Sequence, residues 1–310
     1  MENQSSDFNS RLLELERLIS EERYNYIKAG AKFCSYQFIR TCLLDSYLAA
    51  FHIMFLKFPN CKDLFNSDKL FKNILALLND RKYAQAKVVS MWQLKHVKID
   101  HTCKEVDFYG NMKDHFPLFH KLVCAEMTSN QKIPNDSLIH KEILSNFNKF
   151  GYIKALGDPA DPTLILLYCL TSEPLPCVKD KKKRIFEIQF FLLGKDEHMA
   201  MCFRFSTNEW LFYDNDPAKP SFQSFSFDTI KEYVICLAGY VNITQAQECK
   251  LGIPETGEGT GAQPFYSSES TSLLDTEQSV EDVEMEDLSS YSVPIPETGE
   301  GLGPQPFYQN

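Results

Sequence analysis

The spacing of apolar residues changes near Asp161, and this change constrains the fold more than any other feature of the sequence. Before it, apolar side chains recur at intervals typical of helices, whereas short aromatic and aliphatic runs separated by turn signals follow it. Helices are expected at residues 7–28, 41–57, 64–79, 82–96 and 137–148, and strands at residues 163–171, 184–194, 198–206, 209–214 and 233–241. This order predicts an α+β domain in which an N-terminal helical part packs on a C-terminal antiparallel sheet, rather than alternating βαβ units.

Two of the predicted helices carry further expectations. In residues 41–57, the apolar positions, which include Leu44, Leu48 and Phe51, fit a largely buried helix better than an exposed one. Trp92 lies in the helix predicted at 82–96, and we expect its side chain in the core rather than on a binding surface. The region 98–134 has no clean period and is expected to contain loops.

Composition favours a globular protein without structural zinc or disulfides. With 44% apolar residues, 24 Phe and 14 Tyr, the 310-residue chain can bury a sizeable core. Its ten cysteines include no CxxC pair and have no regular spacing, and no histidines are spaced to share a helical face as metal ligands. The polar, acidic start does not resemble a signal peptide, and the longest apolar stretch is too short to cross a bilayer. We therefore expect a soluble protein of the cytoplasm or nucleus, with no metal and no cofactor.

The last 60 residues differ from the rest. Residues 251–310 hold twelve acidic side chains and no Lys or Arg, which leaves 30 acidic beside all 32 basic side chains in the remainder. A nearly neutral body argues against a nucleic-acid partner. The segment repeats IPETGEGTGAQPFY at 253–266 as IPETGEGLGPQPFY at 295–308, and has too few apolar residues to offset the entropy cost of folding. We expect a disordered tail, either a solvated linker or a bivalent motif for an unknown partner, after a first helix at 1–30 and a main domain at 31–250.

Cys42 opens the most apolar predicted helix, in the run Thr41-Cys42-Leu43-Leu44-Asp45-Ser46-Tyr47-Leu48. Unpaired N–H groups and the helix dipole stabilise a thiolate at such a position, and the thiolate is the reactive form of cysteine. The competing interpretation is an inert core cysteine, which is the commoner role of a thiol in an apolar helix. This segment alone leaves both interpretations open.

His198 and Asp214 lie on two neighbouring predicted strands. The strand that His198 opens is followed by the short polar turn Ser206-Thr207-Asn208 and by the strand Glu209–Asp214, a pattern typical of a hairpin. A histidine at the head of one strand and an aspartate at the end of its partner can meet, because paired strands lie about 5 Å apart. A carboxylate in that position would fix the tautomer and orientation of the imidazole.

Together these segments resemble the Cys box and the His box of ubiquitin-specific proteases. The Cys box has a catalytic cysteine, two apolar residues, Asn or Asp, Ser, any residue and Leu, and Cys42 to Leu48 match it throughout. The family places Asn or Gln five residues before the nucleophile, where this chain has Gln37. The His box has a histidine that opens a strand, a Trp on the next strand and an aromatic-Asp-Asp/Asn ending, matched here by His198, Trp210, Tyr213, Asp214 and Asn215.

Parts of the family pattern are replaced in this chain. Residues Cys34 to Arg40 stand where the family has Gly-Leu-Xaa-Asn-Leu-Gly-Asn, and Glu197 stands in place of the Gly before the histidine. The interval between Cys42 and His198 is short for the family and has no paired CxxC motifs, so a zinc-bearing fingers subdomain is expected to be absent or reduced. The compact layout is also similar to the SUMO-directed members of the clan.

The resemblance implies a papain-like cysteine protease fold and an isopeptidase that cleaves after the C-terminal glycine of ubiquitin or a ubiquitin-like modifier. Cys42 would be the nucleophile, His198 the general base, Asp214 the orienting carboxylate and Gln37 an oxyanion donor. Asn215 and Asp216 are alternatives to Asp214. The competing function is an inactive module that keeps the fold and binds ubiquitin or SUMO.

Overall fold

The computed structural model describes residues 2–128, 147, 151–168, 170, 174–226 and 230–244. The chain divides into two units, Met1–Ile253 and Pro254–Asn310, and every described residue belongs to the first unit. The predicted tail at 251–310 and most of the predicted helix at 137–148 lie outside the described residues.

The helices occupy the first part of the described chain, as the apolar spacing predicts. They are α1 (Glu2–Glu21), α2 (Cys42–Lys57), α3 (Pro59–Asn66), α4 (Lys69–Asn79), α5 (Tyr83–Met91) and the short 3-10 helices η1 (Met112–Leu118) and η2 (His120–Leu122). The prediction at 41–57 is confirmed by α2, whereas the helix predicted at 64–79 is divided between α3 and α4. Asp68 separates these two helices, since its side chain accepts a hydrogen bond from the Phe71 amide at 3.1 Å and so caps α4.

Strands form a large antiparallel sheet and a small mixed one. They are β1 (Lys32–Phe33), β2 (Tyr36–Ile39), β3 (Lys98–Asp100), β4 (Glu105–Asp107), β5 (Val123–Thr128), β6 (Tyr152–Asp158), β7 (Asp161–Tyr168), β8 (Cys177–Lys179), β9 (Ile185–Lys195), β10 (His198–Arg204), β11 (Trp210–Tyr213), β12 (Phe222–Ser224) and β13 (Val234–Asn242). The large sheet has the order β12-β11-β10-β9-β13-β7-β6-β5, with β8 also paired to β9, and the small sheet has the order β1-β2-β4-β3. The five predicted strands correspond to β7, β9, β10, β11 and β13, and the α+β class is confirmed.

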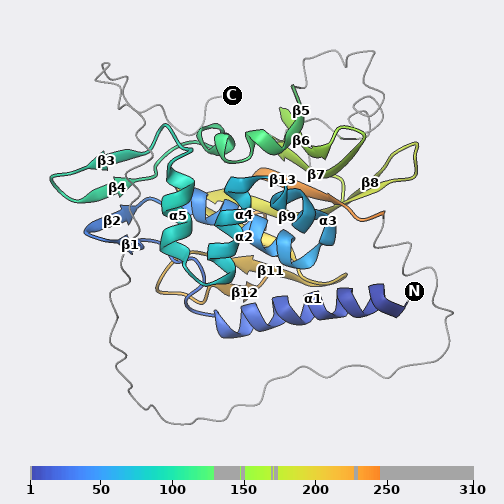
Figure 1. Cartoon of the computed structure of the whole chain (residues 1–310), viewed down its shortest axis with the longest axis horizontal. Helices are drawn as coiled ribbons and strands as arrows, with labels where there is room; N and C mark the ends of the chain where they lie inside the picture. The colour runs from blue at the N-terminus through green and yellow to red at the C-terminus, as the bar shows by residue number, and fades with distance from the viewer. Residues whose placement is uncertain are drawn as a thin grey trace, which may run out of the picture. The chain divides into compact units, whose positions relative to one another are not determined.

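Helix α2 lies at the centre of the first unit, between the large sheet and the other helices (Figure 1). Every residue from Leu43 to Lys57 is buried, whereas Cys42 at its start is only half-buried. On β9, Phe190 and Leu192 face the cluster that includes α2, and Phe191 and Leu193 face a second apolar cluster. Among the described residues no single helix is long and apolar enough to span a membrane, although the sharply bent pair of α2 and α3 satisfies a test of length and composition.

The prediction that Trp92 lies in the core is wrong. Helix α5 ends at Met91, five residues before the predicted end, and the Trp92 side chain just beyond it is 74% exposed. Lys87 of the same helix is completely buried instead. The buried face of α5 is therefore determined by the ion pair of Lys87 with Asp45 as well as by hydrophobicity.

His52 joins the middle of α2 to two other segments. Its buried ring has Nδ1 3.0 Å from the Tyr26 hydroxyl and Nε2 2.9 Å from Oδ1 of Asn79. Because Asn79 Oδ1 only accepts, Nε2 carries the proton, and Nδ1 accepts from Tyr26. Burial lowers the pKa of His52 to about 4, although the hydrogen bond to Asn79 opposes this effect.

We expect the free energy of unfolding to fall as the pH decreases from about 6.5 to about 4. In the unfolded chain His52 takes up a proton near its ordinary pKa of 6.5, whereas the folded protein resists protonation until about 4, so acid favours unfolding. Urea unfolding of wild-type protein and His52→Gln at several pH values measures this effect. The variant should be less stable at neutral pH and its stability should depend less steeply on pH, with part of the slope kept because His115 also has a pKa lowered to about 4. Equal slopes for both proteins would contradict the assignment.

Candidate active site

A tight turn between β9 and β10 sets the position of His198. The turn consists of Asp196 and Glu197, whose φ angles are 49° and 61°, and Lys195 pairs with His198 across it. Positive φ at both central residues gives a turn whose twist matches that of the two strands it joins. Glu197 thus occupies a backbone conformation that favours glycine.

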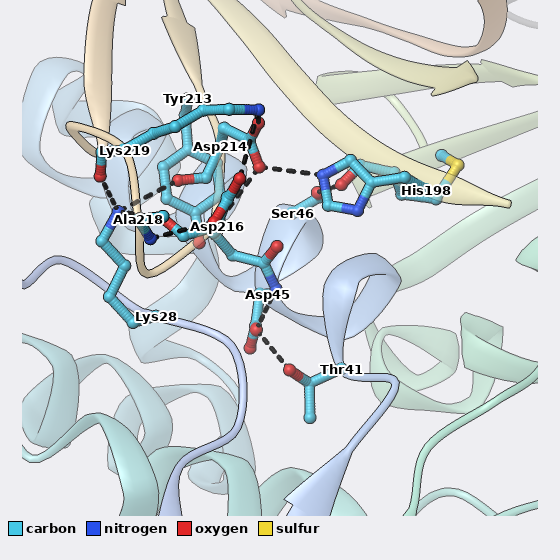
Figure 2. A network of polar contacts seen from close by, with 12 residues as sticks. Lys28, Thr41, Asp45, Ser46, His198, Tyr213, Asp214, Asp216, Ala218 and Lys219 are labelled. Atoms are coloured by element: carbon cyan, nitrogen blue, oxygen red, sulfur yellow. Dashed lines mark hydrogen bonds and ion pairs between the residues drawn. The ribbon is translucent and has the colours of Figure 1, made fainter. Parts of the chain in front are cut away.

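Strand β11 brings Asp214 to His198. Met201 pairs with Tyr213 in the antiparallel ladder, so the next residue, Asp214, lies beside the first part of β10. His198 Nε2 is 2.8 Å from Asp214 Oδ1 (Figure 2). The structure therefore contains the contact across the hairpin that the two sequence segments predict.

Asp214 is negatively charged although it is buried, with only 4% of its surface exposed. Burial acts to raise its pKa, but the hydrogen bond with His198, the amide of Asp216 and the charge of Lys219 outweigh burial and lower the pKa to about 2. The Asp216 amide donates to Asp214 Oδ1 at 3.0 Å, and Lys219 Nζ lies 3.5 Å from Oδ2. At neutral pH the Asp214 carboxylate can accept a hydrogen bond from the imidazole N–H of His198 and so fix the orientation of the ring.

Cys42, the first residue of α2, also affects the titration of the His198 ring. The hydrogen bond to Asp214, followed in size by that to Cys42, raises the pKa of His198 to about 10 against the opposing effect of burial. Because Asp214 takes Nε2, Nδ1 is the ring nitrogen that Asp214 leaves available. Ser46, one turn along α2, donates to the Met199 carbonyl at 3.4 Å and fixes the helix against β10. The side chains of Cys42 and His198, far apart in sequence, therefore lie close enough for the cysteine to raise the pKa of the imidazole.

Gln37 lies on β2, and its side-chain amide is engaged with its own loop. Nε2 donates to the Gly30 carbonyl and lies 3.5 Å from the Ala31 carbonyl and 3.3 Å from that of Phe38. These backbone oxygens are the polar partners that the structure gives the amide. An oxyanion role for Gln37 requires this amide to leave Gly30 when substrate binds.

The two alternatives to Asp214 have other partners. Asp216 accepts from the Ala218 amide at 2.9 Å and lies 3.2 Å from Lys219, and the Asn215 side chain donates to Asp45 at 2.7 Å. None of these three contacts involves His198. Of the three consecutive residues, Asp214 is the one whose side chain bonds the imidazole.

Two lysines next to the site had no role in the sequence prediction. Lys28 Nζ donates to the carbonyls of Asp216 at 2.9 Å and Lys219 at 2.7 Å, and Lys87 lies beside Asp45. A lysine in an amphipathic segment is normally solvated, so the sequence carries no signal for either contact. Within the described part of the chain, no three His, Cys, Asp or Glu side chains gather as potential metal ligands.

Comparisons with known proteins add a distant structural similarity. No protein-family model matches the chain, and no curated protein matches it. The SAGA DUB module containing Ubp8, Sgf11, Sus1 and Sgf73 is similar at 10% identity and a TM-score of 0.33, over 74% of this chain and 72% of the other. A form of that module bound to monoubiquitin is similar at 9% identity and a TM-score of 0.30, over 71% of this chain and 70% of the other.

We expect the His198 imidazole to be protonated at neutral pH and to titrate near the pKa of about 10 that its partners impose. Asp214→Asn removes the carboxylate, which is the largest cause, so the titration midpoint should move down toward the ordinary value of 6.5. NMR titration of the ring in both proteins measures the change. Glu232→Gln is a matched control, because it removes a carboxylate that pairs with Lys195 on the β9–β10 hairpin at 2.8 Å. A midpoint that moves equally in the control and in Asp214→Asn would contradict the assignment.

Proposed function

We propose that this protein is a papain-like cysteine isopeptidase that hydrolyses the bond after the C-terminal glycine of ubiquitin or a ubiquitin-like modifier. One observation carries the proposal: a single imidazole, His198, bonds a buried aspartate at the end of a strand, and a cysteine at the start of a helix helps to raise its pKa. A thiol, an imidazole and a carboxylate in that order form the apparatus of cysteine-dependent acyl transfer.

In the proposed reaction, the proton of the Cys42 thiol passes to His198, the Sγ thiolate attacks the carbonyl carbon of the isopeptide bond, and an electron pair moves onto the carbonyl oxygen. As this intermediate collapses, the C–N bond breaks and protonated His198 gives its proton to the leaving lysine amine. Water then attacks the thioester and transfers a proton to His198, and the C–S bond breaks to release the modifier carboxylate. The raised pKa of His198 suits this role, because the imidazole holds the proton that the leaving amine needs.

The start of α2 offers one donor for the developing oxyanion without any rearrangement. Cys42 is the first helical residue, so its backbone N–H has no partner inside the helix. The positive end of the helix dipole also lies there. The Cys42 amide is thus the first proposed oxyanion donor and Gln37 the second.

The choice of modifier class rests on the sequence boxes. The match of Cys42 to Leu48 and the order of His198, Trp210 and Asp214 support a protease directed at ubiquitin or SUMO over a general peptidase. The competing binding module has one specific observation in its favour, since the Gln37 amide is bonded to the Gly30 carbonyl.

Ubiquitin and SUMO probes with a C-terminal electrophile test this proposal. Such a probe should form a covalent adduct with wild-type protein and none with Cys42→Ala, because the adduct is a bond to Cys42 Sγ. Cys103→Ala is the matched control, since it removes an exposed thiol in the β3–β4 turn and should leave labelling unchanged. Adduct formation by Cys42→Ala would exclude this nucleophile. Non-covalent binding of the modifiers without any adduct would identify the protein as a binding module.

For Gln37, we expect replacement by Ala to lower kcat with little change in KM, because an oxyanion donor acts only in the transition state. The loss should be on the order of a hundredfold, which is typical when one donor is removed. Steady-state hydrolysis of a fluorogenic modifier conjugate measures both constants. An unchanged kcat would remove Gln37 from the mechanism and leave the Cys42 amide as the proposed donor.

A further inference from the structure

A fully buried ion pair lies directly behind the candidate active site. Lys87 Nζ of α5 is 2.9 Å from Asp45 Oδ1 and 3.1 Å from Oδ2, and both side chains are 0% exposed. Charges are costly to bury, and apolar residues of similar size often replace a buried ion pair without loss of stability. Stability alone is therefore a weak reason for a charge pair at this position.

Asp45 contacts both sides of the site at once. It lies three residues after Cys42 in the first turn of α2, where it accepts from the Thr41 hydroxyl at 2.6 Å. The same oxygen, Oδ2, accepts from the side chain of Asn215 at 2.7 Å, and Asn215 directly follows Asp214. Figure 2 shows Asp45 between Thr41 and the loop that carries Asp214. One carboxylate thus joins the helix that carries the thiol to the loop that carries the orienting aspartate.

The opposite end of the ion pair reaches the same loop by a second path. Lys87 Nζ also donates to the Lys28 carbonyl at 2.7 Å, and Lys28 Nζ donates to the carbonyls of Asp216 and Lys219. In the same segment, the Ala29 amide donates to the Asn215 carbonyl at 2.8 Å. The loop after β11 is therefore tied to α2 and α5 through side chains that do not touch the imidazole.

Burial acts to raise the pKa of Asp45, while Lys87, Thr41 and Asn215 favour its charged form. The pair is consequently sensitive to the loss of any one member. Removing a single charge leaves its partner buried without compensation, whereas neutral side chains at both positions can hydrogen-bond with each other.

We propose that Asp45 and Lys87 are positioning residues that keep the Cys42 sulfur and the His198–Asp214 pair aligned through Asn215. The inference rests on the proposed function, which supplies the reaction that this alignment serves. It differs from a role in folding because it predicts a change at His198 and Cys42, two side chains that the ion pair does not contact.

The test uses Asp45→Ala, which removes the whole junction, and Asn215→Ala, which removes only the tie to the loop. Asn215→Ala keeps the Asp45–Lys87 pair and serves if Asp45→Ala fails to fold. The double variant Asp45→Asn with Lys87→Gln is the rescue, because an amide pair can replace the ion pair without buried charge. Asp180→Ala is the matched control, since it breaks another buried ion pair, with Arg184 at 2.6 Å, in the β8–β9 turn.

Three quantities are measured for each protein: the Tm, the NMR titration midpoint of His198, and the rate at which iodoacetamide alkylates Cys42, followed by mass spectrometry of its peptide. Asn215→Ala and Asp45→Ala should lower the His198 midpoint and slow alkylation by on the order of tenfold to a hundredfold, the effect of a small misplacement of reacting groups. The double variant should restore both values toward wild type. Asp180→Ala should lower the Tm alone.

If Asn215→Ala and Asp45→Ala lower only the Tm, as the control does, the positioning proposal is overturned. Failure of the proposed function gives a different result, because wild-type protein would then form no adduct with ubiquitin or SUMO probes. Alkylation and the His198 titration need no modifier, so they test the alignment whether or not a probe reacts.

Discussion

The burial of α2 is the constraint on which the rest of the structure depends. A helix enclosed from Leu43 to Lys57 needs a sheet on one side and further helices on the others, which the first unit supplies. Cys42, at the N-terminal end, is the residue of this helix that retains exposure. Since β10 packs on α2 and begins at His198, the position of the helix fixes which strand end meets the thiol. The core thus positions the site before any polar contact is considered.

The sequence predicts the elements with strong patterns and misses those whose formation depends on distant partners. Helix α2 is long and apolar, and β10 and β11 are apolar runs on either side of a polar turn, and both features are found as predicted. The strands β1 to β4 have only two to four residues each, which is too short for a period to show, and their pairing depends on contacts between segments far apart in the chain. The region 98–134, expected to contain loops, also includes β3, β4 and β5.

Helix α5 shows the limit of hydropathy most directly. The sequence places Trp92 inside and gives no reason to bury Lys87, yet Trp92 is exposed and Lys87 is enclosed. A lysine side chain is buried only where an opposite charge pairs with it. The partner of Lys87 is Asp45, which lies on a different helix 42 positions earlier in the chain. Asp45 itself is visible in the sequence as part of the Cys box. Its partner is not, because pairing across helices leaves no local pattern.

The polar groups around the site balance one another in pairs. Asp45 faces Lys87, whereas Asp214 faces His198 and, at longer range, Lys219. A buried carboxylate at the start of the thiol helix would oppose a thiolate there if it were not compensated, so Lys87 removes a penalty that Asp45 alone would impose. The His198 imidazole, whose pKa is raised to about 10, is then the positive group nearest this end of the helix in the proposed mechanism. In the proposed mechanism, neutralising the carboxylate behind the helix leaves the helix dipole and His198 free to act on Cys42.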